Sequence, residues 1–314
     1  MSGAPAASPA PAWTRQRTRG GRLGLPFFAL LARAGRAGLL FVPWCLAWVG
    51  LWFVLFAPAA RRASGQLARR VGRGGSAWGR LWFTWRHFYT YGLLLIERML
   101  LLRGRADLFQ VEFVGEELIG AALREGRGAV LVAAHLGSWE AMGQLLGRRL
   151  DARVSVVMSD AVAPAPGGAQ QALEGGRSYE VLVTDGSPAA AAAILAALGE
   201  GRLVGMMGDR VLAGRGVALP FLGGRALFPV GPYAVAAAAS APLFHVHALR
   251  TGRRRYRFQA WPQGVLAFGA RAEREADLAR WAGDYAARLE EQLRAHPEQW
   301  GNLFPFWVAE GGAG

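Results

Sequence analysis

The stretch "GAVLVAAHLGSWEA", residues 128–141, joins an apolar run to a turn and a helix start. Residues 129–134 carry no charge and no polar side chain, which is typical of a strand buried on both faces of a sheet. Gly137 permits a tight turn, and Ser138 is a residue type that caps helices. The stretch therefore predicts a buried strand, a sharp turn and a helix, the unit from which parallel α/β sheets are built.

The same alternation of apolar runs and helical patterns continues along the chain, beginning near residue 106. Further strands are predicted at 110–115, 153–158, 180–184, 202–207, 243–249 and 255–261. Helices are predicted at 116–125, 138–149, 187–199, 231–240 and 271–295. This order predicts an α/β domain over residues 106–314 with a largely parallel sheet flanked by helices. Functional sites of such sheets gather at the carboxyl ends of the strands, where His135 lies.

The excess positive charge of the chain lies in its first third. Residues 1–105 contain 16 arginines and one acid, Glu97, whereas residues 106–314 contain 20 arginines and 21 acids. An unbalanced basic region predicts attraction to anionic lipid head groups or to an acidic protein partner. The chain lacks zinc-finger, RNA-recognition and basic-zipper patterns, so we expect no nucleic-acid partner.

An uncharged stretch occupies residues 37–60, "AGLLFVPWCLAWVGLWFVLFAPAA". A helix of 24 residues is long enough to cross a hydrocarbon core of about 30 Å, although one long buried helix would read the same way. Trp44, Trp48 and Trp52 recur every four residues and share one helical face. We expect this segment to anchor the chain to a membrane, either spanning it or lying in one leaflet.

A second aromatic-rich helix is predicted at residues 77–102, "AWGRLWFTWRHFYTYGLLLIERMLLL". Together with the uncharged stretch it gives a membrane-associated helical region over residues 23–105. Residues 1–22 are basic and rich in Ala, Pro and Ser, which predicts a disordered tail. Arginines are more frequent after the uncharged stretch than just before it, which favours a cytoplasmic location for the following domain.

His135 and Glu140 are the first candidates for chemistry. If the turn returns Glu140 to His135, the carboxylate holds one tautomer of the imidazole and raises its basicity, as a general base requires. The base would act on a hydroxyl of the substrate, because the sequence offers no Ser or Cys in a nucleophile-elbow context. A buried structural histidine followed by a first-turn glutamate is the alternative, and spacing alone does not decide between them.

Four further polar residues are candidate ligands. Asp209 and Arg210 follow the predicted strand 202–207 directly, and a guanidinium at that position suits a phosphate or an acid. His245 and His247 alternate along a strand and share a face, but a third metal ligand is not evident. We therefore expect no metal site.

The residues carry a resemblance to a known family. "HLGSWE" (135–140) matches the His-x4-acid motif of glycerolipid and lipid A acyltransferases, with Glu in the last position as in the lipid A late acyltransferases. Three later segments are similar to further blocks of this lauroyl/myristoyl acyltransferase family, in the same order: "LVGMMGDR" (203–210), "GVALPFLGGRALFPVGPYAVAAAASAPLFHV" (216–246) and "HPEQW" (296–300).

The resemblance implies a membrane-bound acyltransferase at the cytoplasmic face of a bacterial inner membrane. His135 would deprotonate an acceptor hydroxyl, which attacks the thioester of an acyl carrier protein or acyl-CoA, and no cofactor is implied. Glu140 would orient His135 or bind the acceptor. Gly137, Ser138, Asp209 and Arg210 are assigned to substrate binding, with the 136–138 backbone or Arg210 as donors to the oxyanion. Asp209 supports the site rather than reacting.

The sequence also departs from the family. The phosphate-binding Phe-Pro-Glu-Gly block of glycerol-phosphate acyltransferases is absent, and "GDR" (208–210) replaces a longer acidic version. The acceptor is therefore a lipid A-like or other glycolipid, or alternatively a phospholipid, aminolipid or polyene-type lipid. A different class of function, a non-catalytic membrane-docked lipid-binding protein, also stays open.

Overall fold

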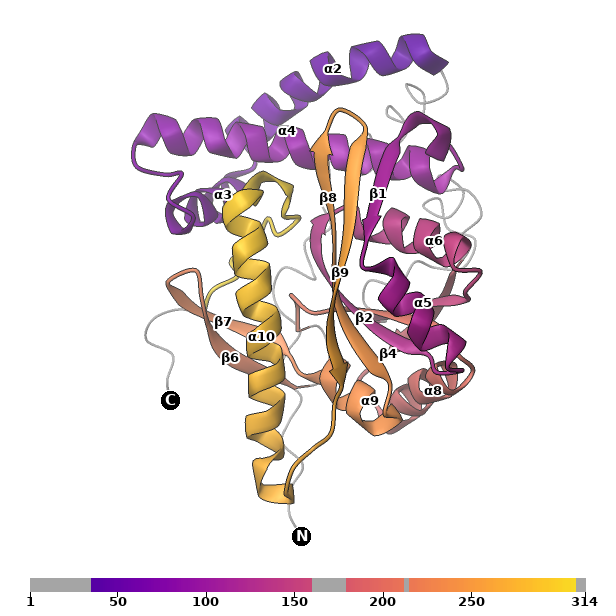
Figure 1. Ribbon diagram of the computed structural model, residues 1–314. Coiled ribbons are helices and arrows are strands. Elements are labelled where there is room, and N and C mark those ends of the chain that lie inside the picture. Colours follow the sequence, from indigo (N-terminus) through magenta and orange to yellow (C-terminus); the bar gives the residue numbers. More distant parts are fainter. Residues whose placement is uncertain (1–34, 160–178, 212–214, 309–314) are drawn as a thin grey trace.

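A seven-stranded sheet runs through the computed structural model, with helices on both of its faces (Figure 1). The structure describes residues 35–159, 179–211 and 215–308. The strand order is β1-β9-β8-β2-β5-β3-β4. The strands are β1 (Gln110–Val114), β2 (Ala129–Gly137), β3 (Val154–Ser159), β4 (Tyr179–Thr184), β5 (Leu203–Met207), β8 (Pro242–Gly252) and β9 (Arg255–Val265).

Most of this sheet is parallel. β2 pairs in parallel with β5 and β8, and β3 pairs in parallel with β4 and β5. β9 returns antiparallel along β8, and β1 then pairs in parallel with β9 at the edge. The predicted α/β class with a largely parallel sheet is confirmed, and β2 occupies the centre because its residues 129–134 are buried on both faces.

The helices of the α/β region agree with the predicted pattern, with their ends shifted by a few residues. They are α5 (Glu116–Arg124), α6 (Trp139–Arg149), α8 (Pro188–Gly199), α9 (Gly231–Ala239) and α10 (Arg274–Ala295). Short 3₁₀ turns lie at Ala106–Leu108, Arg271–Glu273 and Pro297–Gln299. α10 buries Trp281, Tyr285, Leu289 and Leu293, one every four residues, so a single face of the helix packs on the sheet.

Three helices precede the sheet: α2 (Gly35–Phe56), α3 (Pro58–Arg70) and α4 (Ala77–Leu102). The uncharged stretch is therefore broken at Ala57 rather than continuous to residue 60. A proline disfavours helical backbone in the residue before it, and Ala57 adopts φ −116° and ψ 71° ahead of Pro58. Pro43 lies inside α2.

The break bears on whether this region crosses a membrane. Among the described residues, no single helix is both long and apolar enough to do so. Residues 40–56 and 58–70 meet the length and composition requirement together, but the two helices are bent by 99°. α2 packs along α4, where the Trp85 indole N–H donates to the Ala47 carbonyl at 3.1 Å. Figure 1 places both helices across one end of the sheet.

A β-hairpin that was not predicted lies beside α10. It consists of β6 (Gly216–Phe221) and β7 (Gly224–Pro229). Its turn uses Leu222 and Gly223, both with positive φ, at 48° and 71°. The usual Asn-Gly or Asp-Gly turn signal is missing, and for this reason no hairpin was expected here.

The predicted domains are residues 1–22, 23–105 and 106–314. Residues 1–22 lie outside the described residues. The boundary at 105/106 falls between α4 and the 3₁₀ turn at Ala106–Leu108. A division into a membrane-associated region and an acyltransferase domain stays a prediction.

Candidate active site

His135 lies in the last part of β2. The predicted strand ended at Ala134, but β2 continues to Gly137, and its register with β8 shifts between Ala133 and Gly137. Such an irregularity redirects side chains at a strand end. Gly137 has φ +71°, and a Cβ there would lie 1.9 Å from the Ala248 carbonyl oxygen. Glycine is therefore required at 137, because the backbone of β8 passes so close.

Asp209 is the carboxylate that meets His135. Its Oδ1 lies 2.8 Å from His135 Nδ1, and its Oδ2 accepts the His135 backbone N–H at 3.0 Å. Trp300 Nε1 and Asn302 Nδ2 donate to the same Oδ2 at 3.0 and 3.4 Å. Asp209 is fully buried. These donors replace the water that a buried carboxylate loses.

Gly208 makes this approach possible. A Cβ at residue 208 would lie 2.6 Å from Val132 and 2.7 Å from the ring of Tyr285. The chain leaving β5 therefore passes close to β2 and α10. The Gly208 N–H donates to the Ala133 carbonyl at 2.7 Å. Asp209 follows directly and reaches the imidazole.

The pair prepares His135 to accept a proton. An ionised Asp209 accepts the Nδ1 proton, which leaves the Nε2 lone pair free. No other described residue forms a hydrogen bond with Nε2, and 23% of the side chain is exposed. Burial lowers the pKa of His135, as does Arg210, while Asp209 opposes the shift. Burial alone would raise the pKa of Asp209, but the imidazole and Arg210 lower it to about 2.

Glu140 does not return to His135 as the turn was expected to allow. It lies in the first turn of α6, as predicted, but its buried carboxylate forms an ion pair with Arg98 of α4 and accepts the Tyr179 hydroxyl of β4. Because the chain stays in β2 through Gly137, the helix starts too late for the side chain to fold back. The orienting contact comes from Asp209 instead.

Ser138 occupies the N-cap position of α6 without capping it. Its side chain accepts no hydrogen bond from the helix, and Oγ is buried with no partner among the described residues. Its backbone N–H donates to the Ala248 carbonyl at 2.8 Å. This bond removes the Ser138 N–H from the expected donors to an oxyanion.

Arg210 is held beside the pair by the C-terminal segment. Its Nε donates to Asn302 Oδ1 at 2.7 Å, and its Nη2 donates to the Gly301 carbonyl at 2.9 Å. The guanidinium carbon lies 5.0 Å from the centre of the Phe304 ring. A cation is therefore fixed close enough to His135 to lower its pKa.

Comparison with known proteins locates this geometry within a family. Residues 105–308 match the model of the bacterial lipid A biosynthesis acyltransferases. The chain belongs to this family. The predicted resemblance is confirmed, and the match contains His135, Glu140, Asp209 and Arg210.

Curated relatives agree with this membership. Phosphatidylinositol mannoside acyltransferase of Mycobacterium tuberculosis H37Rv is 30% identical over 200 residues, 62% of this chain and 60% of the relative. The protein of the same name from Mycolicibacterium smegmatis is 26% identical over 204 residues, 64% of each chain. The chain thus spans about 60% of the length of the curated relatives it matches.

The segment 296–302 packs against the part of β2 that carries His135. Trp300 bridges to Leu136, and the Gly301 N–H donates to the His135 carbonyl at 2.6 Å. His87 of α4 lies 2.7 Å from the Trp300 carbonyl oxygen. The amide of Gln299 exchanges two 2.8 Å hydrogen bonds with the backbone of Arg250. These hydrogen bonds hold residues 296–300, the block that resembles the family, so that Trp300 can donate to Asp209.

Sequence reasoning missed four residues that hold the two acids. Trp300 ends the family-like block 296–300, but that block did not indicate that its buried indole N–H would donate to Asp209. Nothing in the spacing of Asn302, Arg98 or Tyr179 pointed to the site. Their partners are 39 to 93 residues away in sequence.

The histidines of β8 have separate environments. His245 Nε2 lies 2.8 Å from Gln263 Oε1, whereas both ring nitrogens of His247 are buried without a partner in the described residues. Burial lowers the pKa of His245 to about 4 and that of His247 to about 3. Within the described residues, no group of three or more His, Cys, Asp or Glu side chains is arranged to hold a metal ion.

Proposed function

We propose that the protein transfers a fatty acyl chain from the thioester of an acyl carrier protein, or of acyl-CoA, to a hydroxyl of a glycolipid acceptor. The observation that carries this proposal is the His135–Asp209 pair at the strand end, inside the region matched by the family. An imidazole oriented by a buried carboxylate supplies the general base that a hydroxyl needs in order to attack a thioester. The scheme uses no cofactor.

The reaction needs one proton to move twice. His135 Nε2 takes the proton of the acceptor hydroxyl while the hydroxyl oxygen forms a bond to the thioester carbonyl carbon. The tetrahedral intermediate then collapses with loss of the carbon–sulfur bond, and Nε2 returns its proton to the leaving thiolate. Asp209 keeps the imidazole in one tautomer and stabilises its charged form throughout.

Arg210 is the group best placed to stabilise the oxyanion of that intermediate. It is positioned rigidly by Asn302, Gly301 and Phe304, and a donor that does not need to reorganise is worth most in catalysis. The Ser138 N–H is already bonded to Ala248. Gly137 contributes by allowing the strand to turn at this point. The Ser138 hydroxyl is buried without a described partner, and its expected role in substrate binding stays a prediction.

The acceptor is the least specified part of the proposal. The relatives are named as phosphatidylinositol mannoside acyltransferases and the family as lipid A enzymes, so both point to a phosphate-bearing glycolipid. Of the two roles expected for Glu140, its contacts with Arg98 and Tyr179 argue against orientation of His135, and acceptor binding stays a prediction. A phospholipid, aminolipid or polyene-type acceptor is the alternative.

Membrane association is supported by the surface of the N-terminal helices. α2 has no charged side chain between Ala37 and Phe56 and exposes several large apolar residues. Soluble surfaces rarely leave such a patch uncovered. We propose attachment to the inner membrane with the sheet on the cytoplasmic side. The exposed residues are Leu40, Phe41, Trp44, Trp48, Leu51, Trp52, Leu55 and Phe56.

The test compares lipids from a strain that lacks the gene after complementation with wild-type or variant protein. His135→Ala should abolish the acyl chain added to the acceptor, a loss of about a thousandfold or more in rate. Glu117→Ala, which changes an exposed residue of α5 away from the site, should leave the lipid unchanged. Mass spectrometry of the lipids and immunoblots of membrane fractions provide the measurements. Unaltered acylation by membrane-bound His135→Ala would favour a non-catalytic lipid-binding protein.

A thioesterase would use water instead of a lipid hydroxyl. The purified full chain is mixed with an acyl-CoA or acyl carrier protein thioester, with and without membrane lipid extract. The proposal expects slow release of free fatty acid and fast transfer once lipid is added. Equal consumption of the thioester in both mixtures, with free acid as product, would replace transfer by hydrolysis.

A further inference from the structure

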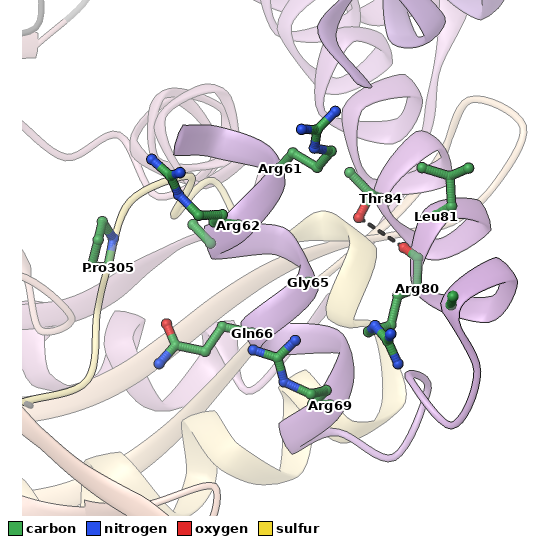
Figure 2. Close-up of a pocket in the computed structure, with 11 residues that line it drawn as sticks. Arg61, Arg62, Gly65, Gln66, Arg69, Arg80, Leu81, Thr84 and Pro305 are labelled. Carbon is green, nitrogen blue, oxygen red and sulfur yellow. Dashed lines mark hydrogen bonds between the residues drawn. The ribbon is translucent and has the colours of Figure 1, made fainter. Parts of the chain in front are cut away.

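A cavity of about 470 Å³ lies between α3 and α4, outside the His135 site. Its size falls in the usual range of ligand pockets, about 300–1,000 Å³. Figure 2 shows how the two helices contribute to it: Arg61, Arg62, Gln66 and Arg69 come from α3, and Arg80 and Thr84 come from α4. Four arginines therefore line one cavity.

The charge of these arginines is not balanced by nearby acids. Residues 35–96 contain neither Asp nor Glu, and the next acid, Glu97, is bonded to Arg250 and Tyr256. Arg62 and Arg69 form no side-chain hydrogen bond or ion pair with another described residue. Other arginines, such as Arg149 and Arg257, are paired with surface acids.

The other two arginines are fixed by neutral groups. Arg61 donates to the Val54 carbonyl at 2.8 Å, and Arg80 donates to the Gly74 carbonyl at 3.0 Å. These bonds position the guanidinium groups without reducing their charge. The cavity therefore keeps a positive potential that a compact anion would neutralise. A guanidinium matches the paired oxygens of a phosphate particularly well.

The surroundings of the cavity indicate where that phosphate comes from. Leu81 is part of its wall, and the neighbouring Trp78 and Trp82 of α4 are 80% and 60% exposed. The first of the four arginines lies only a few residues after Phe56, which ends the apolar helix α2. Exposed indoles next to arginines are typical of the head-group level of a membrane.

We infer that this arginine cavity binds the phosphate of an anionic membrane phospholipid and docks the protein on the bilayer through it. The inference rests on the proposed membrane association and names the site and the chemical group responsible. The remaining face of contact is the apolar surface of α2. The cavity thus adds recognition of a head group to an otherwise unspecific apolar attachment.

The experiment measures binding of the purified full chain to vesicles of phosphatidylcholine with and without phosphatidylglycerol, by flotation. The variant Arg62→Gln/Arg69→Gln removes two charges from the cavity and keeps a polar side chain at both positions. Its matched control, Arg73→Gln/Arg148→Gln, removes two exposed arginines that do not line the cavity. Thermal unfolding of both variants verifies the fold. Glycerol 3-phosphate is added as a soluble competitor, and acyl carrier protein binding is measured separately.

The cavity variant should lose about tenfold or more of its binding to phosphatidylglycerol vesicles, and the control about threefold or less. Millimolar glycerol 3-phosphate should weaken wild-type binding and leave the variant unaffected. Equal losses in both variants would assign the binding to diffuse charge and overturn the inference. Retained vesicle binding together with lost acyl carrier protein binding would also overturn it, because the cavity would then serve the acyl donor.

This test is independent of the reaction at His135. The variant His135→Ala leaves every residue of the cavity in place and should bind phosphatidylglycerol vesicles as the wild type does. If acyl transfer fails while the vesicle result holds, the proposed function is wrong and the docking site stands. If acyl transfer proceeds and both double variants bind vesicles alike, the docking site is wrong and the reaction stands.

Discussion

Two buried carboxylates near the end of β2 have opposite surroundings. Asp209 accepts hydrogen bonds from an imidazole, an indole, an amide and a backbone N–H, and its oxygens are aimed at His135. Glu140 is five residues from His135 in sequence, yet it faces the guanidinium of Arg98 and the hydroxyl of Tyr179. Strand order therefore decides which carboxylate reaches the histidine, and sequence distance does not.

The reason lies in the sheet. β2 and β5 are parallel neighbours, so their carboxyl ends meet at the same edge and bring residues 135 and 209 together. The chain after His135 instead continues straight to Gly137 before it turns into α6. The first turn of α6 then lies against α4, from which Arg98 projects. One carboxylate serves the imidazole, and the other neutralises a cation between two helices.

The largest effect that tests this contrast is expected from Asp209→Asn. An amide presents an N–H or a neutral oxygen to Nδ1 and favours the wrong tautomer of His135, so kcat should fall by about a thousand- to ten-thousandfold. The assay is acyl transfer by the purified full chain to lipid extract. Asp185→Asn changes an exposed carboxylate at the end of β4 and should retain wild-type rate. A loss of tenfold or less in Asp209→Asn would contradict the assigned role.

Glu140→Gln should act first on stability. The change leaves Arg98, whose side chain is 22% exposed, without its ion-pair partner, and removing one member of a buried pair costs about 3–5 kcal/mol. We expect a loss of about 3 kcal/mol in the free energy of unfolding, measured by urea denaturation.

The matched control is Glu116→Gln. Glu116 lies in the first turn of α5 as Glu140 lies in the first turn of α6, but its partner Arg149 is 55% exposed. A surface pair of this kind contributes about 1 kcal/mol or less. Similar losses in the two variants would mean that burial does not distinguish these carboxylates.

Trp300→Phe should have an intermediate effect on the reaction. The ring is retained while the N–H to Asp209 is lost, which removes a hydrogen bond to a charged acceptor worth about 1.5–3 kcal/mol. The pKa of Asp209 should rise, and kcat should fall by about tenfold, corresponding to about 1.4 kcal/mol.

A second C-terminal tryptophan provides the control for that variant. Trp307 donates its N–H to the Phe221 carbonyl of the hairpin at 2.9 Å and, among the described residues, forms no hydrogen bond with the reacting pair. Trp307→Phe should lose similar stability without a loss in kcat. An equal decrease of kcat in both variants would assign the effect of Trp300 to packing alone.

The central part of the fold was predictable because local patterns determine it. The apolar run 129–134 identifies β2, and each later apolar run identifies a strand or helix that the structure contains. The hairpin β6–β7 was not predictable, because its turn residues Leu222 and Gly223 are not those that hairpins favour. The break at Ala57 could have been read from Pro58, which restricts the residue before it.

The residues of the site could be predicted from the sequence, but the contacts between them could not. His135 lies in the last part of β2, and Asp209 and Arg210 come just after β5; positions at strand ends identify such residues as candidates. Pairing Asp209 with His135 requires β2 and β5 to be neighbours, which a single sequence does not state. Trp300 and Asn302 reach Asp209 from 91 and 93 residues away, and no local pattern encodes such contacts.

The smallest effect, and the sharpest separation of the two carboxylates, is expected in the pH dependence of kcat/KM. His135 must be neutral to act as a base, and burial lowers its pKa from 6.5, so kcat/KM should rise with pH with a midpoint below pH 6.5. Asp209 opposes that shift, so Asp209→Asn should move the midpoint to lower pH. Glu140→Gln should move it by about 0.3 unit or less, because Glu140 is neutralised by Arg98. If Glu140→Gln lowers the midpoint by about one pH unit, the Glu140 carboxylate lies beside the imidazole, and the His135–Glu140 pair expected from sequence distance is correct.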